Sequence, residues 1–365
     1  MSEWKTYKWG DLISLEYGKP IPDKNLLDGQ YPVYGTNGRI GTSNLTPLCK
    51  HPSIIVGRKG AYRGVHYSNK PFSVIDTAFF IEPKTSILDL KWAYYKLLTV
   101  DINKMDSGSA IPSTDRYEIY SLSVELPPLE EQQRIAGILG SLDDKIELNR
   151  RINANLEAQA QALFRSWFVD FDNQLGNYQT KSLTDIAQYL NGLAMQKFLP
   201  ESIQNSLPVL KIKELGQGLC DASSDRCSTS IKPEYIINDG DVIFSWSGTL
   251  LVDVWCGGKC GLNQHLFKVT SDNYPKWFIF YWTKHHLDKF IRIAKDKAVT
   301  MGHIKRCDLE SSEVKVPEKP ILEYLDKIFT PLFDSMITHR IENRKLSALR
   351  DTLLPKLMAG EIAIE

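Results

Sequence analysis

One long segment of this chain occurs twice. Residues 124–168 and 314–358 align without a gap at an offset of 190 residues, which pairs Val124 with Val314. Each copy stands behind a longer stretch that is rich in short apolar runs, glycine and proline. Such a duplication predicts two similar halves, and a protein built in this way is suited to reading two similar features at a fixed separation.

The two stretches that precede the repeated segment also share landmarks. Gly18 corresponds to Gly192 and the apolar run 54–57 to 242–245, while the offset drifts between 174 and 190 residues. In each half, short β-rich runs punctuated by turn-forming residues come first, and an aromatic, helix-like segment follows. We therefore expect a mixed α/β unit in each half, with long loops on a rigid frame, where recognition residues usually lie.

Apolar residues recur at steps of four and three through both copies of the repeated segment. This period of 3.5 residues is typical of helices paired in a coiled coil. Helices of about 34 residues, at ~1.5 Å per residue, would run ~50 Å. We expect an α+β fold in which two α/β domains are joined by two long helices, paired as an antiparallel coiled coil with a rough two-fold. The residues expected in the seam are Ile135, Leu139, Leu142, Ile146, Leu156, Leu163 and Trp167 in the first helix and Leu325, Phe329, Leu332, Met336, Leu346, Leu353 and Leu357 in the second.

Polar residues occupy the middle of both seams, Asn149 and Asn153 in the first helix and His339 and Asn343 in the second. Buried polar residues in a seam fix register and orientation at a cost in stability. A solvated or frayed middle fits the same pattern, so the sequence leaves both interpretations open. Pro331 lies inside the second helical pattern and is expected to break or kink it, leaving its N-terminal part as a separate short segment.

Composition limits the function classes. The 365 residues are enough for two domains with connectors, and 42% hydrophobic and 24% charged residues are usual for a globular protein. No apolar run approaches the ~18 residues of a membrane span, and the charged N-terminus lacks an apolar signal core. We therefore expect a cytoplasmic protein with reduced cysteines and no membrane partner. The formal net charge is zero and residues 129–172 hold 5 Lys+Arg against 8 Asp+Glu, which argues against nucleic-acid binding by bulk charge alone.

Motifs for catalysis are missing from the sequence. It contains no Gly-x-x-x-x-Gly-Lys-Ser/Thr loop, no His-Glu-x-x-His and no methyltransferase catalytic loop. We therefore expect a chain that is not itself an enzyme and holds no cofactor or metal. Cys220, Cys227, Cys256 and Cys260 could form a zinc site with His265, but the spacings fit structural zinc only loosely, and free thiols are the favoured interpretation.

Glycine-rich loops in the first half, and matched positions in the second, carry side chains suited to DNA. Arginine and asparagine match guanine and adenine edges, lysine and serine meet phosphates, and glycine lets the backbone approach closely. A single basic, glycine-rich loop is more often an ordinary solvated turn. Because such loops recur at matched positions in both halves, a role in DNA recognition is favoured. The candidates are Thr36, Asn37, Arg39, Arg58, Lys59, Tyr62, Arg63, Ser107 and Ser113 in the first half and Trp246, Ser247, Thr249, Lys295, Lys297, Thr300 and His303 in the second.

Two segments carry a family resemblance. LPPLEEQQRIAGILGSLDDKIELNRRINANLEAQAQALFRSWFVDF closely resembles the central conserved region of type I restriction–modification specificity subunits, and LSALRDTLLPKLMAGEI resembles their distal conserved region. YGTNGRIG and GRKGAYRG also look like loops of their recognition domains. The resemblance covers the whole chain, as target-recognition domain 1 over 1–128, the central helix as spacer over 129–172, target-recognition domain 2 over 173–318 and the distal helix over 319–365.

The resemblance implies a non-catalytic chain that reads a split target in double-stranded DNA, one half per recognition domain, with the helices setting the spacing. It implies two methyltransferase subunits, docked on the helices, that use S-adenosylmethionine to methylate adenine. It also implies two restriction subunits that use ATP and magnesium. Because the recognition loops of the two halves differ, for example GRKGAYRG against SWSGTLLVDVW, we expect an asymmetric target.

Two rival classes stay open. A stand-alone sequence-specific DNA-binding protein would bind tightly by itself, and the zero net charge and acidic first helix argue against that. A coiled-coil scaffold would explain the helices but not two similar loop-rich domains. A hidden nuclease or methyltransferase has no motif in its support. Co-purification of a methyltransferase-like partner separates the specificity-subunit interpretation from all three.

Overall fold

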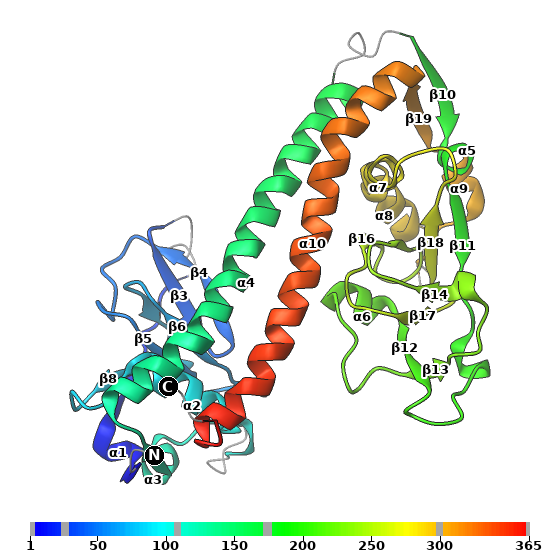
Figure 1. Ribbon diagram of the computed structural model, residues 1–365. Coiled ribbons are helices and arrows are strands. Elements are labelled where there is room, and N and C mark those ends of the chain that lie inside the picture. The colour runs from blue at the N-terminus through cyan, green and yellow to red at the C-terminus, as the bar shows by residue number, and fades with distance from the viewer. Residues whose placement is uncertain (1–3, 23–28, 106–110, 171–176, 297–301, 363–365) are drawn as a thin grey trace. The chain divides into compact units, whose positions relative to one another are not determined.

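The chain divides into two compact units. The computed structural model describes residues 4–22, 29–105, 111–170, 177–296 and 302–362. Unit 1 comprises residues 1–145 and 346–365, and unit 2 comprises residues 146–345. Each unit therefore holds one globular segment together with part of both long helices, whereas the sequence pattern placed the helices in segments of their own (Figure 1).

Unit 1 is built on a four-stranded antiparallel sheet, β2-β8-β5-β6, accompanied by the smaller sheets β4-β3-β7 and β1-β9. In the main sheet β5 is central and fully buried, as its uninterrupted apolar run from Ile54 to Val56 predicts. The elements are β1 (Lys5–Lys8), α1 (Trp9–Leu12), β2 (Ile13–Tyr17), β3 (Tyr31–Gly35), β4 (Gly38–Ser43), β5 (Ser53–Gly57), β6 (Val65–Ser68), β7 (Ser73–Val74), β8 (Ala78–Pro83), α2 (Leu90–Leu98), the 3₁₀ turn Ile102–Lys104, α3 (Arg116–Ser121) and β9 (Ser123–Leu126).

Unit 2 repeats this plan with the sheets β11-β18-β15-β16, β13-β12-β17-β14 and β10-β19. Its elements are β10 (Tyr178–Ser182), α5 (Leu183–Ile186), β11 (Gln188–Asn191), the 3₁₀ turn Met195–Lys197, β12 (Ser206–Leu210), α6 (Ile212–Gln217), β13 (Arg226–Ser228), the 3₁₀ turn Pro233–Tyr235, β14 (Ile236–Ile237), β15 (Val242–Ser245), β16 (Leu251–Val254), β17 (Cys260–Leu262), β18 (Leu266–Thr270), α7 (Lys276–His285), α8 (Leu287–Asp296), α9 (Arg306–Glu310) and β19 (Glu313–Pro317). The expected α+β fold is confirmed, with one mixed sheet unit in each half.

The correspondence between the units extends to single hydrogen bonds. Gly18 donates its N–H to the carbonyl of Ala78 at 3.2 Å, and Gly192 donates to Leu266 at 3.0 Å. A Cβ at Gly18 would come within 2.1 Å of the Ile75 carbonyl oxygen, and one at Gly192 within 2.2 Å of the equivalent backbone oxygen. Any larger residue would force the chain apart at both places, which explains why glycine occurs at this matched pair.

Two long helices each contribute residues to both units. α4 covers Leu129–Phe164 and continues into a π-helical turn at Arg165–Val169, and α10 covers Lys319–Met358. In unit 2, Asn149 contacts Asn343, whereas Asn153, further along α4, contacts Met336 and His339, earlier on α10. The helices are therefore antiparallel in this unit.

The polar middle of the seam is at least half-buried and hydrogen-bonded between the helices, which decides between the two open interpretations. Asn149 is fully buried, and its amide donates to Asn343 Oδ1 at 2.9 Å and to Glu342 Oε2 at 2.7 Å. His339 Nδ1 lies 2.9 Å from Asn153 Oδ1. These bonds are satisfied in one register, so they specify the alignment of the two helices.

The predicted apolar seam positions are all at least half-buried. Phe164, Phe168 and Phe333 are also buried, although the 3.5-residue pattern did not include them. The predicted positions that are buried are Ile135, Leu139, Ile146, Leu325, Phe329, Met336 and Leu357, and those that are half-buried are Leu142, Leu156, Leu163, Trp167, Leu332, Leu346 and Leu353.

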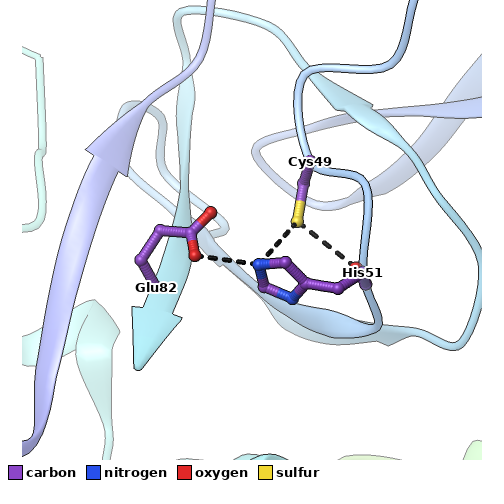
Figure 2. Close-up of side chains that lie close together, drawn as sticks. All are labelled: Cys49, His51 and Glu82. Carbon is purple, nitrogen blue, oxygen red and sulfur yellow. Dashed lines mark hydrogen bonds and ion pairs between the residues drawn. The ribbon is translucent and has the colours of Figure 1, made fainter. Parts of the chain in front are cut away.

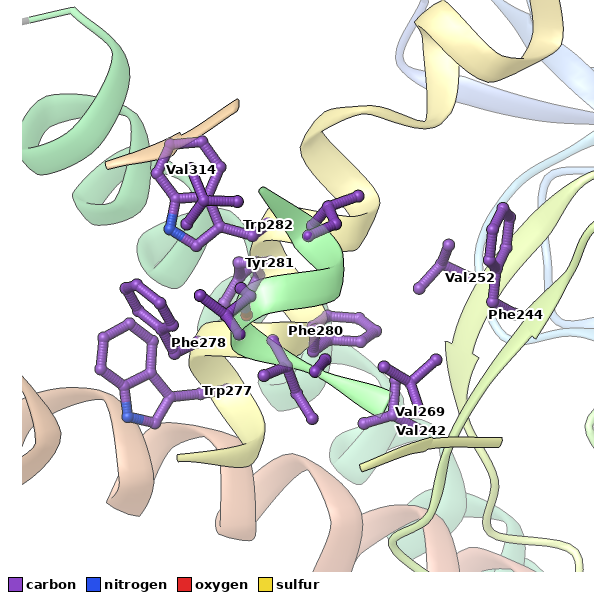
Figure 3. Packing of buried hydrophobic residues seen from close by; sticks show 14 of the residues in the cluster. Val242, Phe244, Val252, Val269, Trp277, Phe278, Phe280, Tyr281, Trp282 and Val314 are labelled. Carbon is purple, nitrogen blue, oxygen red and sulfur yellow. The ribbon is translucent and has the colours of Figure 1, made fainter. Parts of the chain in front are cut away.

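The expectation that Pro331 breaks the second helix is wrong, because α10 passes through it without interruption. The flanking turns are held by the aromatic core of unit 2, which surrounds α7 (Figure 3). Phe329 stacks on Trp277 with ring centroids 4.2 Å apart, and Phe333 packs on Phe280 at 5.3 Å. Pro331 itself is exposed, so its ring meets solvent. Packing on both sides outweighs the one hydrogen bond that a proline removes.

Among the residues that the structure describes, no helix is both long and apolar enough to cross a membrane.

Candidate nucleic-acid interface

Three loops of unit 1 meet at the C-terminal end of β5. The N–H of Gly64 donates to the carbonyl of Thr36 at 2.9 Å, which joins the turn after β3 to the glycine-rich loop after β5. Lys59 and Ser113 form an isolated antiparallel bridge, which joins the same loop to the segment before α3. The structure thus brings together segments that the sequence analysis selected separately as DNA-binding candidates.

Glycine is required at the centre of this junction. Gly60 has φ of +126°, a left-handed conformation that other residues rarely adopt, and its N–H donates to the carbonyl of Pro112 at 2.9 Å. A Cβ at Gly57 would come within 2.2 Å of the Thr36 carbonyl oxygen. The hydroxyl of Thr36 lies within hydrogen-bond distance of the Lys59 and Thr77 carbonyls, at 2.5 and 2.9 Å. We therefore infer that the role of Thr36 is to hold the loops together.

Arg58 is the best-positioned candidate for a base or phosphate contact in unit 1. Its guanidinium donates from Nη1 to the Asp76 carbonyl at 3.0 Å and lies 4.7 Å from the centre of the Tyr17 ring. The guanidinium of Arg116 lies 5.1 Å from the same ring and 4.9 Å from that of Tyr117. A guanidinium carries five N–H donors in a fixed plane, so one carbonyl bond and a stacked ring orient Arg58 and still leave donors for a ligand.

The other first-half candidates differ in accessibility. Asn37, Arg39 and Lys59 are exposed, and Tyr62 is 78% exposed, so all four present polar groups to solvent. Burial lowers the pKa of His66, which keeps a neutral imidazole behind the loop. The accessible face of the junction is therefore basic and carries an amide and aromatic rings, a composition that suits a DNA groove.

The structure corrects the assignment of Arg63. Its side chain is only 4% exposed, and Nη2 donates to the carbonyls of Asn103 and Met105, both at 2.9 Å. A guanidinium buried against backbone oxygens cannot reach a base edge without unfolding the loop. Arg63 therefore supports the loop from inside and does not belong to the contact surface.

Unit 2 builds the same junction from different side chains. Ser247 and His303 form an isolated antiparallel bridge, as Lys59 and Ser113 do in unit 1. Gly248, with φ of +65°, donates its N–H to the carbonyl of Gly302 at 3.0 Å. These bonds match those of Gly60 and its partner, with offsets of 188 and 190 residues along the two segments.

The side chains at the second junction are mainly aromatic where those of the first are basic. Trp246 is half-buried, stacks on Phe267 at 5.6 Å and donates its indole N–H to Asn191 Oδ1 at 3.0 Å. His303 is exposed and lies edge-on to Trp246, at 6.2 Å between ring centroids. The two junctions therefore present different chemistry on the same backbone frame.

Ser247 also needs correction. It is 4% exposed, and its hydroxyl lies 3.0 Å from His265 Nδ1, so it positions that imidazole and is not itself a DNA contact. Thr249 and Lys295 are exposed, as direct contact requires. Ser107, Lys297 and Thr300 lie outside the described residues, and their assignment stays a prediction.

Several residues of the candidate interface were missed by the sequence analysis. Gln264 and His265 line a groove beside Ser247, and the exposed cations Lys213 and Arg226 line it as well. In unit 1 the missed residues are Tyr17, Arg116 and Tyr117. Gln264 stands two residues before the apolar strand β18, and that position could have drawn attention to it. Nothing local marks Tyr17, which reaches Arg58 only through the pairing of β2 with β8.

The second-half cysteines behave as thiols. All six cysteines of the chain are free, and no group of three metal-ligating atoms is found among the described residues around Cys220, Cys227, Cys256 and Cys260. Burial raises the pKa of Cys256 to about 11 and also raises that of Cys227. A hydrogen bond with Cys220, together with burial, raises the pKa of Cys260. The interpretation of these four cysteines as free thiols stays a prediction.

Comparison with known proteins also finds one family match in each half of the chain. The sequence matches the family described as "Type I restriction modification DNA specificity domain" over residues 1–158 and again over 176–346. The specificity subunit of the type I restriction enzyme EcoDI from Escherichia coli is 31% identical, with 100% of this chain and 89% of the relative covered. That of HindI from Haemophilus influenzae is 24% identical over 99% of this chain and 100% of the relative. The specificity subunit of MjaIX from Methanocaldococcus jannaschii is 27% identical, with 78% of this chain and 72% of the relative covered.

A solved structure supports the fold. The crystal structure of the S subunit of a type I restriction–modification system from M. genitalium has a TM-score of 0.64 and 17% identity, with 98% of this chain and 96% of that chain covered. The chain belongs to the family of type I restriction–modification DNA-specificity subunits. The expectation of a specificity subunit that is not the catalytic component of its enzyme is therefore confirmed.

Proposed function

We propose that this chain sets the target of a type I restriction–modification complex by reading a bipartite DNA sequence, with one half-site for each unit. The observation that carries the proposal is the duplicated loop junction, in which the Lys59–Ser113 bridge recurs as Ser247–His303. A shared frame places each set of loops in the same way on its own unit. Different side chains on that frame select different bases, so the target is asymmetric.

The side chains at each junction suit recognition in the major groove. Arg58 carries the fork of donors that matches the O6 and N7 acceptors of guanine, and its aromatic support restrains it before binding. In unit 2, Gln264 offers the amide that matches adenine, beside the exposed cations Lys213 and Arg226, which suit phosphates. Contacts of both kinds are needed, because phosphate contacts position a protein and base contacts specify the sequence.

We also propose that α4 and α10 space the two half-sites and dock two methyltransferase subunits, which in turn engage two restriction subunits. Large apolar side chains outside the helix seam support docking: Leu148 is 46% exposed, Tyr324 54% and Leu349 47%. Exposed apolar side chains on long helices are the usual material of a protein interface. S-adenosylmethionine, ATP and magnesium would then be bound by the partner subunits, in a complex acting on DNA in the cytoplasm.

Methylome sequencing tests this function directly. Cells that carry this gene with the methyltransferase gene of the same system are compared with cells that lack only this gene. A split, asymmetric motif methylated on adenine should be present in the first and absent from the second. A methylation pattern that is unchanged by the deletion would refute the proposal and favour a stand-alone DNA-binding protein or a scaffold.

A further inference from the structure

Three metal-ligating side chains of different chemistry meet on unit 1, away from the loops described above. Figure 2 shows the thiol of Cys49, the imidazole of His51 and the carboxylate of Glu82 turned toward one another. His51 Nε2 lies 2.8 Å from Glu82 Oε2 and 3.8 Å from Cys49 Sγ. One donor atom from each residue falls within 4.8 Å of the other two.

Backbone structure holds each of these side chains in place. The N–H of Cys49 donates to the Phe72 carbonyl, and the Cys49 carbonyl accepts from the Phe72 N–H, both at 2.9 Å. Glu82 belongs to β8, where it pairs with Ser14 of β2. The Nδ1 of His51 lies 3.0 Å from the Pro52 carbonyl oxygen, so Nδ1 carries the proton and Nε2 faces the other two groups. A histidine that ligates a metal usually has this arrangement, with the remote ring nitrogen bound to a carbonyl.

We propose that Cys49, His51 and Glu82 form a binding site for one thiophilic divalent transition-metal ion, zinc in the first instance. Thiolate, imidazole and carboxylate are the three ligand types that zinc accepts, and a three-residue set leaves one coordination position for water. The Cys-x-His spacing is visible in the sequence. The third ligand, Glu82, lies 31 residues after His51 in the sequence, and strand pairing places it beside the other two.

Two of the three donor separations are close to those of a tetrahedral site, and the third, from Cys49 Sγ to the Glu82 carboxylate, is within 4.8 Å. With metal bonds of about 2.3 Å to sulfur and about 2.0–2.2 Å to nitrogen and oxygen, a tetrahedral site has an S···N separation of about 3.6 Å and an N···O separation of about 3.4 Å. The S···N distance of 3.8 Å is already close to that value. The N···O distance of 2.8 Å must open by about half an ångström, because a proton now bridges the pair where a metal would lie.

Protonation of the metal-free state is consistent with that picture. Partial burial lowers the pKa of His51, but hydrogen bonds to Pro52 and Glu82 outweigh it and leave the pKa raised. Burial raises the pKa of the Cys49 thiol. A metal ion binds the thiolate and the neutral imidazole, so metal binding at this site competes with protons.

The proposed site lies at one end of the central strands and the recognition loops at the other. His51 stands just before β5 and Glu82 near the end of β8, whereas the candidate DNA loop begins after Gly57, which pairs with Ala78 at the start of β8. A metal here would clamp the segment before β5 to β8. The expected effect is thermal stabilisation of unit 1 and not a change in the DNA sequence that is read.

Cobalt titration of the full-length, chelator-treated protein tests the proposal. Co²⁺ should give a thiolate-to-metal charge-transfer band and tetrahedral visible bands that saturate at one ion per chain, and Zn²⁺ should abolish them by competition. Glu82→Gln and His51→Asn should each weaken binding at least about tenfold. Both side chains are about 40% exposed, at 41% and 42%, so these variants should fold. Cys49→Ser should remove the charge-transfer band.

Cys307→Ser supplies the matched control, since Cys307 is an exposed cysteine on α9 of unit 2. This variant should keep the full cobalt spectrum. Zinc should also raise the thermal midpoint of the wild-type protein but not that of Glu82→Gln. Absence of the charge-transfer band, or a band that is lost in Cys307→Ser and kept in Glu82→Gln, would overturn the proposal and leave a simple His51–Glu82 ion pair.

Discussion

Lys59 and Ser113 form a single antiparallel bridge that fastens the glycine-rich loop after β5 to the segment before α3. The bridge is flanked by hydrogen bonds from Gly60 to Pro112 and from Thr114 to Arg58, at 2.9 and 2.8 Å. Loops held by backbone bonds can change their side chains without losing their place. This property allows one backbone frame to carry two different sets of side chains in the same chain.

Replacement of Arg63 should destabilise unit 1. Arg63→Met removes two hydrogen bonds from a buried cation to backbone carbonyls, and we expect a loss of about 2–4 kcal/mol in the free energy of unfolding. Tyr62→Ala, at the adjacent exposed residue, should stay within about 0.5 kcal/mol. Urea unfolding of both variants measures the difference. Equal stability of Arg63→Met and wild type would return Arg63 to the contact surface.

The asparagine pair in the helix seam should show strong coupling. Asn149→Leu removes the buried amide from which Asn343 and Glu342 accept hydrogen bonds, at a cost of about 1–3 kcal/mol. The double variant Asn149→Leu with Asn343→Leu should recover most of that loss, because two apolar side chains then pack together. A double-mutant cycle measures the coupling, with exposed Asn155→Ala as the control. Additive losses would mean that the pair does not specify the register.

Pro331→Ala should stabilise the protein. The helix already passes through this exposed position, so alanine adds a backbone donor and removes ring strain without a change in packing. Proline costs up to about 3 kcal/mol relative to alanine inside a helix, and we expect a gain of about 1–3 kcal/mol. Chemical unfolding provides the measurement. A loss of stability would show that the α10 geometry around Phe329 and Phe333 depends on the proline.

Acid should weaken unit 2 through His286. Burial lowers the pKa of His286 from 6.5 to about 4, although a hydrogen bond to the Glu313 carbonyl opposes the shift. The unfolded chain therefore takes up the proton first, and the stability due to neutral His286 is complete above pH 6.5 and is lost as the pH falls toward about 4. We expect up to about 2 kcal/mol of loss between about pH 7.5 and pH 5.

The matching control for this effect is His286→Gln, which cannot titrate. Its stability should depend less on pH than that of the wild type over the same interval, when urea midpoints are compared at each pH. Parallel pH profiles for the two proteins would rule out His286 as the source of the acid sensitivity.

Much of the architecture could be predicted because it rests on periodicity and duplication. The presence of two long helices, their seam positions and the repeated strands follow from the apolar periodicity and the duplication, both of which are visible in the sequence. Pro331 was misjudged because local propensity ignores packing, and Phe329 stacked on Trp277 decides the outcome there. Tertiary contact routinely overrides such local preferences.

The candidate interface was predicted only in part, since accessibility depends on long-range structure. Arg58 and Arg63 lie five residues apart in one basic loop. The guanidinium of Arg58 stacks on the ring of Tyr17, whereas that of Arg63 is buried and donates to the Met105 carbonyl. The positions of these two side chains depend on the pairing of β2 with β8 and on the segment after α2, and the local sequence specifies neither of them. For the same reason, the sequence alone did not indicate that Glu82 lies close to Cys49.

The central claim is that each unit reads its own half of the DNA target. The most direct measurement is the methylome of cells that carry the partner methyltransferase with wild-type chain, with Arg58→Ala plus Lys59→Ala, or with Gln264→Ala plus His265→Ala. Each lost base contact should cost about 1–3 kcal/mol of discrimination. We predict that the first pair relaxes bases in one half of the split motif and the second pair relaxes bases in the other half only. Relaxation of the same half by both pairs, or uniform loss across the motif, would contradict the account.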